Sequence, residues 1–129
     1  MPPVEDYMSR TLVTIEPDAQ LGEAAKLMVA RDVGAVLVLE GERLTAILTE
    51  RDVLKAVAAG QHAHSAVSDW MTRDPETIEP SDSTDLAASL MIHGGFRHLP
   101  VVDAGAVVGI VSIRDLMRLN IEDHAPRGA

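Results

Sequence analysis

The sequence predicts an α/β protein built from two β-α-β-β-α repeats that pack as a pseudo-twofold pair. Shifting the sequence by 63 places lays Val4–Lys55 on Val67–Arg118 without a gap, and sixteen aligned positions are identical. An internal repeat of this length indicates a repeated structural unit. Each half has about 60 residues, the lower limit for independent folding, so two halves that bury apolar faces together are favoured.

The alignment also predicts the domain organisation. The first repeat spans residues 4–60 and the second spans 67–121, with a connector at 61–66 rich in turn-forming residues. Residues 122–129 are expected to form a flexible tail.

Each repeat is expected to open with a short strand and a helix. Leu12–Ile15 is β-prone and is followed by Pro17, which cannot donate to a sheet. Apolar residues then recur at helical spacing, which predicts a helix from about Ala19 to Ala30 with Asp18 as its N-cap.

A hairpin and a second helix follow. Ala35–Leu39 and Leu44–Leu48 are rich in aliphatic residues, and the four-residue connection at 40–43 predicts antiparallel pairing. The helix Glu50–Ala59 is expected to end at Gly60. The second repeat predicts the same order: a strand near 77–78, a helix at 83–93, strands at 98–102 and 107–111, and a helix at 113–120.

Composition narrows the class of function. With 11 basic and 20 acidic residues the formal charge is −9, which opposes binding to nucleic acid or an anionic membrane. No apolar run approaches the ~20 residues of a membrane span, and the start lacks the plan of a secretory signal, so the cytoplasm is expected. The chain has no cysteine, and His62 and His64 lack an evident third ligand, so no metal site is predicted.

The strand-to-helix junction carries the chemistry. Thr49-Glu50-Arg51-Asp52 in the first repeat matches Ser112-Ile113-Arg114-Asp115 in the second. One interpretation is a helix cap, in which hydroxyl and acid exchange hydrogen bonds with the backbone. The other is a nucleotide site, because a helix start suits phosphate and an acid accepts ribose hydroxyls. No acid pair comes with a nucleophile, base or metal set, so catalysis is not predicted.

These residues resemble a known family. The opening Thr-Ile-x-Pro at 14–17 and 77–80, the run Arg97–Asp103, and the closing junction resemble the cystathionine-β-synthase (CBS) domain. Two such domains in tandem resemble a Bateman module, over about residues 4–119. The resemblance implies two clefts that bind adenosine derivatives: AMP, ADP, ATP or S-adenosylmethionine.

The resemblance also implies the site residues, because each cleft takes its acid from one repeat and its adenine contacts from the other. One site would comprise Thr49, Arg51 and Asp52 with Thr77, Ile78, Arg97 and His98. The other would comprise Ser112, Arg114 and Asp115 with Thr14, Ile15, Gly34 and Ala35.

The two predicted sites differ in charge. Arg97-His98 occupies the place of Gly34-Ala35, so the Asp52 site gains two candidate phosphate ligands. We expect a charged nucleotide there, and a less charged ligand or none at Asp115.

The family resemblance implies a stand-alone ligand sensor without a catalytic cofactor, which forms a homodimer and signals to an unidentified protein partner. Binding would act by favouring one conformation. Two alternatives remain open: a ligand-free module that dimerises or docks on an enzyme or transporter, and an enzyme acting on nucleotides. The lack of a P-loop counts against the second.

Overall fold

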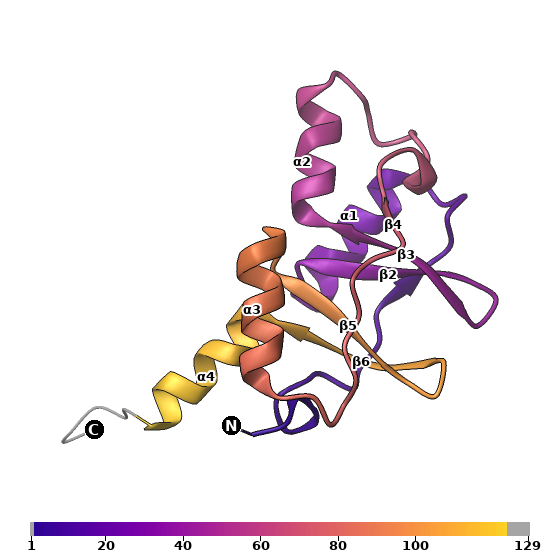
Figure 1. Cartoon of the computed structure of the whole chain (residues 1–129). Coiled ribbons are helices and arrows are strands. Elements are labelled where there is room, and N and C mark those ends of the chain that lie inside the picture. The colour runs from indigo at the N-terminus through magenta and orange to yellow at the C-terminus, as the bar shows by residue number, and fades with distance from the viewer. Residues whose placement is uncertain (1, 124–129) are drawn as a thin grey trace. The chain divides into compact units, whose positions relative to one another are not determined.

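The computed structural model describes residues 2–123 and forms two compact α/β units. Unit A is the continuous segment Thr11–Pro75. Unit B combines Met1–Arg10 with Glu76–Ala129. The element order repeats along the chain, so the predicted α/β class and the repeated β-α-β-β-α plan are confirmed (Figure 1).

Unit A contains a four-stranded sheet in the order β1-β2-β3-β4. Strands β2 and β3 form the predicted antiparallel hairpin, β1 runs parallel to β2, and β4 pairs antiparallel with β3. The elements are β1 (Thr14–Ile15), α1 (Leu21–Arg31), β2 (Ala35–Glu40), β3 (Arg43–Thr49), α2 (Glu50–Ala58), η2 (Val67–Asp69) and β4 (Thr72–Arg73).

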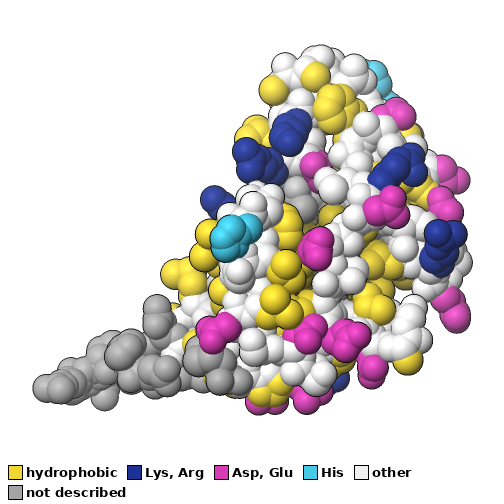
Figure 2. Space-filling view, in the orientation of Figure 1, with side chains coloured by type: hydrophobic (Ala, Val, Ile, Leu, Met, Phe, Trp, Pro, Cys, Tyr) yellow, Lys and Arg dark blue, Asp and Glu magenta, His cyan; other side chains and the backbone are white. Residues whose placement is uncertain are grey.

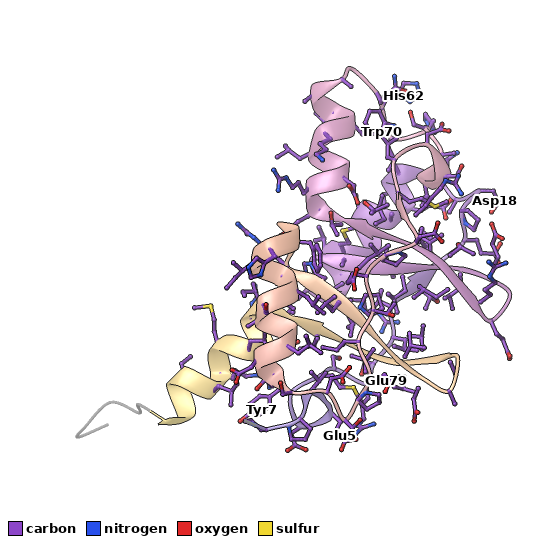
Figure 3. The ribbon with its side chains drawn as sticks, in the orientation of Figure 1. Glu5, Tyr7, Asp18, His62, Trp70 and Glu79 are labelled. Atoms are coloured by element: carbon purple, nitrogen blue, oxygen red, sulfur yellow. The ribbon has the colours of Figure 1, made fainter. Side chains whose placement is uncertain are left out.

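The core of unit A is aliphatic, and it follows the period-two pattern of the hairpin. Val36, Val38, Ala46 and Leu48 alternate along the strands and are fully buried, because successive side chains point to opposite faces of a sheet. The apolar faces of both helices pack against them, as does Trp70, which lies beside α2 in Figure 3.

Unit B repeats this plan with a two-stranded sheet. Strands β5 and β6 pair antiparallel, Ile78 bridges Val101 in parallel, and Ser9 bridges Ile110 antiparallel. The two bridges stand where β1 and β4 pair in unit A. The elements are η1 (Val4–Asp6), α3 (Thr84–Gly94), β5 (His98–Asp103), β6 (Ala106–Ser112) and α4 (Ile113–Asp123).

The flank that opens each repeat packs into the unit built from the other repeat. Val4 and Met8 belong to the core of unit B, together with Leu99 and Val111 of the second repeat. Val67, the equivalent of Val4, is fully buried in the core of unit A. Figure 1 shows the indigo N-terminal segment within unit B. Sequence patterns did not predict this exchange.

Two expectations are corrected. Asp18 does not cap α1: the N-cap is Gln20, without a side-chain hydrogen bond, and the N–H groups of Leu21 and Gly22 donate instead to carbonyl oxygens of Ser65 and Ala63, at 2.8 and 2.9 Å. Those connector carbonyls satisfy amides that a capping side chain would otherwise serve. Helix α4 continues to Asp123 rather than ending at residue 120 as predicted, and the flexible tail at 122–129 stays a prediction. Residues 124–129 lie outside the described residues.

Candidate functional site

The junction of β3 and α2 holds Asp52 in a capping box. The backbone N–H of Thr49 donates to Asp52 Oδ2 at 3.0 Å, and the N–H of Asp52 donates to Thr49 Oγ1 at 3.2 Å. The predicted capping role is therefore confirmed for this copy. Asp52 is nevertheless only 8% exposed, which is unusual for an acid. The positive end of the α2 dipole favours its negative charge.

The junction of β6 and α4 repeats this geometry. The N–H of Ser112 donates to Asp115 Oδ2 at 2.8 Å, and the N–H of Asp115 donates to Ser112 Oγ at 3.1 Å. Both acids are therefore fixed to the start of their helix through one carboxylate oxygen. The other oxygen, Oδ1, is where the two copies differ.

Among the described residues of unit A, none donates a hydrogen bond to Oδ1 of Asp52, whereas within unit B Oδ1 of Asp115 lies 3.1 Å from Nη2 of Arg118. The hydroxyls of Thr49 and Thr72 lie 3.2 and 3.5 Å from Asp52, and both approach Oδ2. Asp52 thus presents an open acceptor, and Asp115 presents one already paired with a cation.

Backbone contacts bring the start of each hairpin next to its own junction. Within unit A, the carbonyl of Gly34 accepts the N–H of Glu50 at 2.9 Å, and Ala35 pairs with Thr49. Within unit B, the carbonyl of Arg97 accepts the N–H of Ile113 at 2.9 Å, and His98 pairs with Ser112. That Arg97 and His98 serve the ligand of Asp52 stays a prediction, as does the pairing of Gly34 and Ala35 with Asp115.

The remaining predicted residues lie at strand and helix ends. Thr14 and Thr77 are exposed, Ile15 is half-buried in β1, and Ile78 is buried beside β5. Arg51 and Arg114 are exposed in the first turn of α2 and α4. Neither arginine side chain bonds another described residue, so both guanidinium groups are available to an anion.

Sequence reasoning missed two residues beside the acids. Thr72 sits in β4 with its hydroxyl near Asp52, and Arg118 pairs with Asp115. The repeat held a signal for each, because Ser9 and Lys55 keep a hydroxyl and a cation at the equivalent positions.

The structure offers no metal centre among the residues it describes, where no group of three or more histidine or acidic side chains converges. His62 and His64 contact each other edge-on, with ring centroids 5.5 Å apart. In the same part of the chain, no helix has the length and apolar character needed to cross a bilayer.

The fold and the twice-occurring capped acid define a tandem-repeat α/β protein with two equivalent helix-start sites. The sequence profile described as CBS domain matches residues 4–59 and 67–122, so the chain belongs to the CBS-domain family. The resemblance seen in the sequence is thereby confirmed.

Known proteins of similar sequence and structure carry the same module. CBS domain-containing protein YhcV of Bacillus subtilis is 37% identical over 117 residues, covering 90% of this chain and 84% of YhcV. The CBS domain pair of protein MJ0100, in complex with 5′-methylthioadenosine and S-adenosyl-L-methionine, superposes with a TM-score of 0.89 at 27% identity, covering 96% of this chain and 99% of that one.

A third similar protein has a nucleotide bound. The CBS domain protein PAE2072 from Pyrobaculum aerophilum, complexed with AMP, gives a TM-score of 0.83 at 26% identity, covering 95% and 98% of the two chains. Both of these structural neighbours are therefore CBS-domain proteins with adenosyl compounds bound.

Proposed function

We propose that this protein is a regulatory ligand sensor that binds an adenosyl compound through Asp52. The observation that carries the proposal is the open Oδ1 of a buried, helix-fixed carboxylate. A carboxylate held this way accepts the hydroxyl protons of a ribose without losing side-chain entropy on binding. The adenosyl ligands of the MJ0100 and PAE2072 structures support the choice of ligand.

Neighbouring groups suit a phosphorylated ligand. The start of α2 offers a positive dipole end, and Arg51 in its first turn carries a guanidinium group without a protein partner among the described residues. AMP, ADP and ATP would use both features, whereas S-adenosylmethionine and 5′-methylthioadenosine would use the ribose acid alone. Binding regulates rather than catalyses, because it acts by favouring one conformation.

Surface composition supports a homodimer as the form that transmits the signal. Figure 2 shows apolar side chains at the surface among scattered acidic ones. The large exposed apolar side chains on the helices recur at equivalent positions of the two repeats: Val29 with Ile92, and Leu54 with Met117. Apolar side chains exposed at equivalent positions of both units suit a self-complementary contact. They also favour the second candidate, a module that dimerises or docks without a ligand.

Calorimetric titration with AMP, ADP, ATP, S-adenosylmethionine and 5′-methylthioadenosine tests the proposal. Wild type should bind at least one of them, and Asp52→Asn should weaken that binding about 10- to 100-fold, the loss expected for a hydrogen bond to a charged acceptor. Ligand at one hundred times its dissociation constant should stabilise wild type by about 2.7 kcal/mol.

Ser83→Ala is the matched control, because Ser83 caps α3 through the N–H of Leu86 at 3.2 Å and lies outside the proposed site. It should lower stability as a lost cap does and leave affinity unchanged. If wild type binds none of the five compounds, the sensor function is refuted and the ligand-free module is favoured.

A further inference from the structure

Arg118 makes three contacts within unit B. Its Nη2 atom donates to Oδ1 of Asp115 at 3.1 Å and to the carbonyl oxygen of Tyr7 at 2.7 Å. Its Cζ atom lies 6.0 Å from the centre of the Tyr7 ring, within the range of a cation–π interaction. Figure 3 labels Tyr7 in the N-terminal segment. Arg118 therefore joins the helix-start acid to the exchanged flank.

The equivalent cation of the first repeat makes no such contact. Lys55 follows Asp52 by three residues, as Arg118 follows Asp115, and Trp70 stands in the place of Tyr7. The Lys55 side chain forms no hydrogen bond or ion pair with the other described residues. A planar guanidinium group can bridge a carboxylate and a carbonyl, whereas an ammonium group is a compact charge that stays well hydrated. The two repeats thus differ in the cation that follows the acid by three residues.

We infer that Arg118 is a specificity-determining residue that blocks the Asp115 carboxylate, so that each chain binds one adenosyl ligand, at Asp52; this rests on the proposed function. Ribose hydroxyls donate protons, and at Asp115 they meet an oxygen that already accepts from a cation. An exposed ion pair alone is weak, and the Arg118 side chain is 51% exposed. The Tyr7 carbonyl and ring add two contacts that a ligand must also break.

Exchanging the two cations tests the inference. Calorimetry with AMP and with 5′-methylthioadenosine should show one ligand molecule bound per wild-type chain. This binding should be lost in Asp52→Ala and retained in Asp115→Ala. Arg118→Lys reproduces the first-repeat residue and should raise the stoichiometry to two. Lys55→Arg should bring a guanidinium group to Asp52. It should raise the dissociation constant of the ligand at Asp52 at least about tenfold, the effect of occupying a charged acceptor.

The outcomes distinguish the role of Arg118 from the proposed function. Two equivalents bound by wild type, or one equivalent bound by Arg118→Lys, refute the role of Arg118 and leave the proposed function standing. Binding that depends on Asp115 rather than Asp52 refutes both the role of Arg118 and the assignment of the ligand to Asp52. If neither wild type nor Arg118→Lys binds either compound, the proposed function itself is refuted. Thermal unfolding of both variants checks that the exposed substitutions leave the fold intact.

Discussion

Gly109→Ala tests whether the exchanged N-terminal flank needs a glycine in β6. A Cβ atom at this position would lie 2.8 Å from the carbonyl oxygen of Ser9 and 2.7 Å from Sδ of Met8. The Met8 side chain is flexible, but Ser9 is held by paired backbone hydrogen bonds with Ile110, of 2.8 and 3.0 Å. The added methyl group must therefore push backbone away from backbone.

The sign of the change in the free energy of unfolding shows whether the added methyl group clashes. Gly109 does not have a positive φ, so without a clash alanine would stabilise the protein by about 0.4–1 kcal/mol through the unfolded chain. Overpacking costs about 1–3 kcal/mol. The net expectation is a loss of about 1–2 kcal/mol, or about 4–8 °C in Tm for a chain of this size.

Urea unfolding and calorimetry measure this loss, and hydrogen exchange at the Ser9 and Ile110 amides should quicken. The control is Ala46, the equivalent residue of the first repeat, which carries a methyl group opposite Arg73 and is fully buried. Ala46→Gly should cost about 1 kcal/mol, since it removes a buried methyl group and adds backbone freedom. A Gly109→Ala protein as stable as wild type would refute the reasoning.

Substitutions at three further positions probe stability, each by urea unfolding. Thr84→Val should stabilise by about 1 kcal/mol, because the buried Thr84 hydroxyl has no hydrogen-bond partner among the described residues; a loss of stability would mean that the hydroxyl is satisfied. Gly22→Ala should destabilise despite the helix propensity of alanine, because its Cβ would lie 2.9 Å from Cβ of Ala63; a gain contradicts this. Thr49→Ala should cost about 1 kcal/mol by breaking the capping box, and Thr49→Ser should restore most of it.

Local chemistry predicted most of the secondary structure. The hairpins and helices of both repeats follow from aliphatic alternation, helical spacing and turn residues, and the junction Thr49–Asp52 forms the capping box that its residue types indicate. The predictions that failed were those that depend on contacts between residues distant in the sequence. Asp18 is a good capping residue, yet the connector carbonyls of Ala63 and Ser65 satisfy the first amides of α1 instead. No local pattern reveals a partner more than 40 residues away.

The candidate site also combines features that the sequence predicts with features that only the fold reveals. The residue types at 49–52 and 112–115 predicted two equivalent acids, and the structure shows both at helix starts. The repeat also preserved a cation three residues after each acid, as Lys55 and Arg118. Only the fold reveals that Arg118 reaches the Tyr7 carbonyl, because that contact joins residues 111 positions apart. The chemical difference between the acids therefore depends on tertiary structure.

The exchanged flanks impose an order on folding during synthesis. Unit A is continuous, so Thr11–Pro75 can fold as soon as it has left the ribosome. Ser9 emerges earlier, but its partner Ile110 follows about one hundred residues later, a delay of about 5–20 s at ordinary translation rates. Val4 and Met8 remain without their core during that time. These two residues are thus made before unit A and buried after it, and a chain that stops before β6 would leave them exposed to proteases and chaperones.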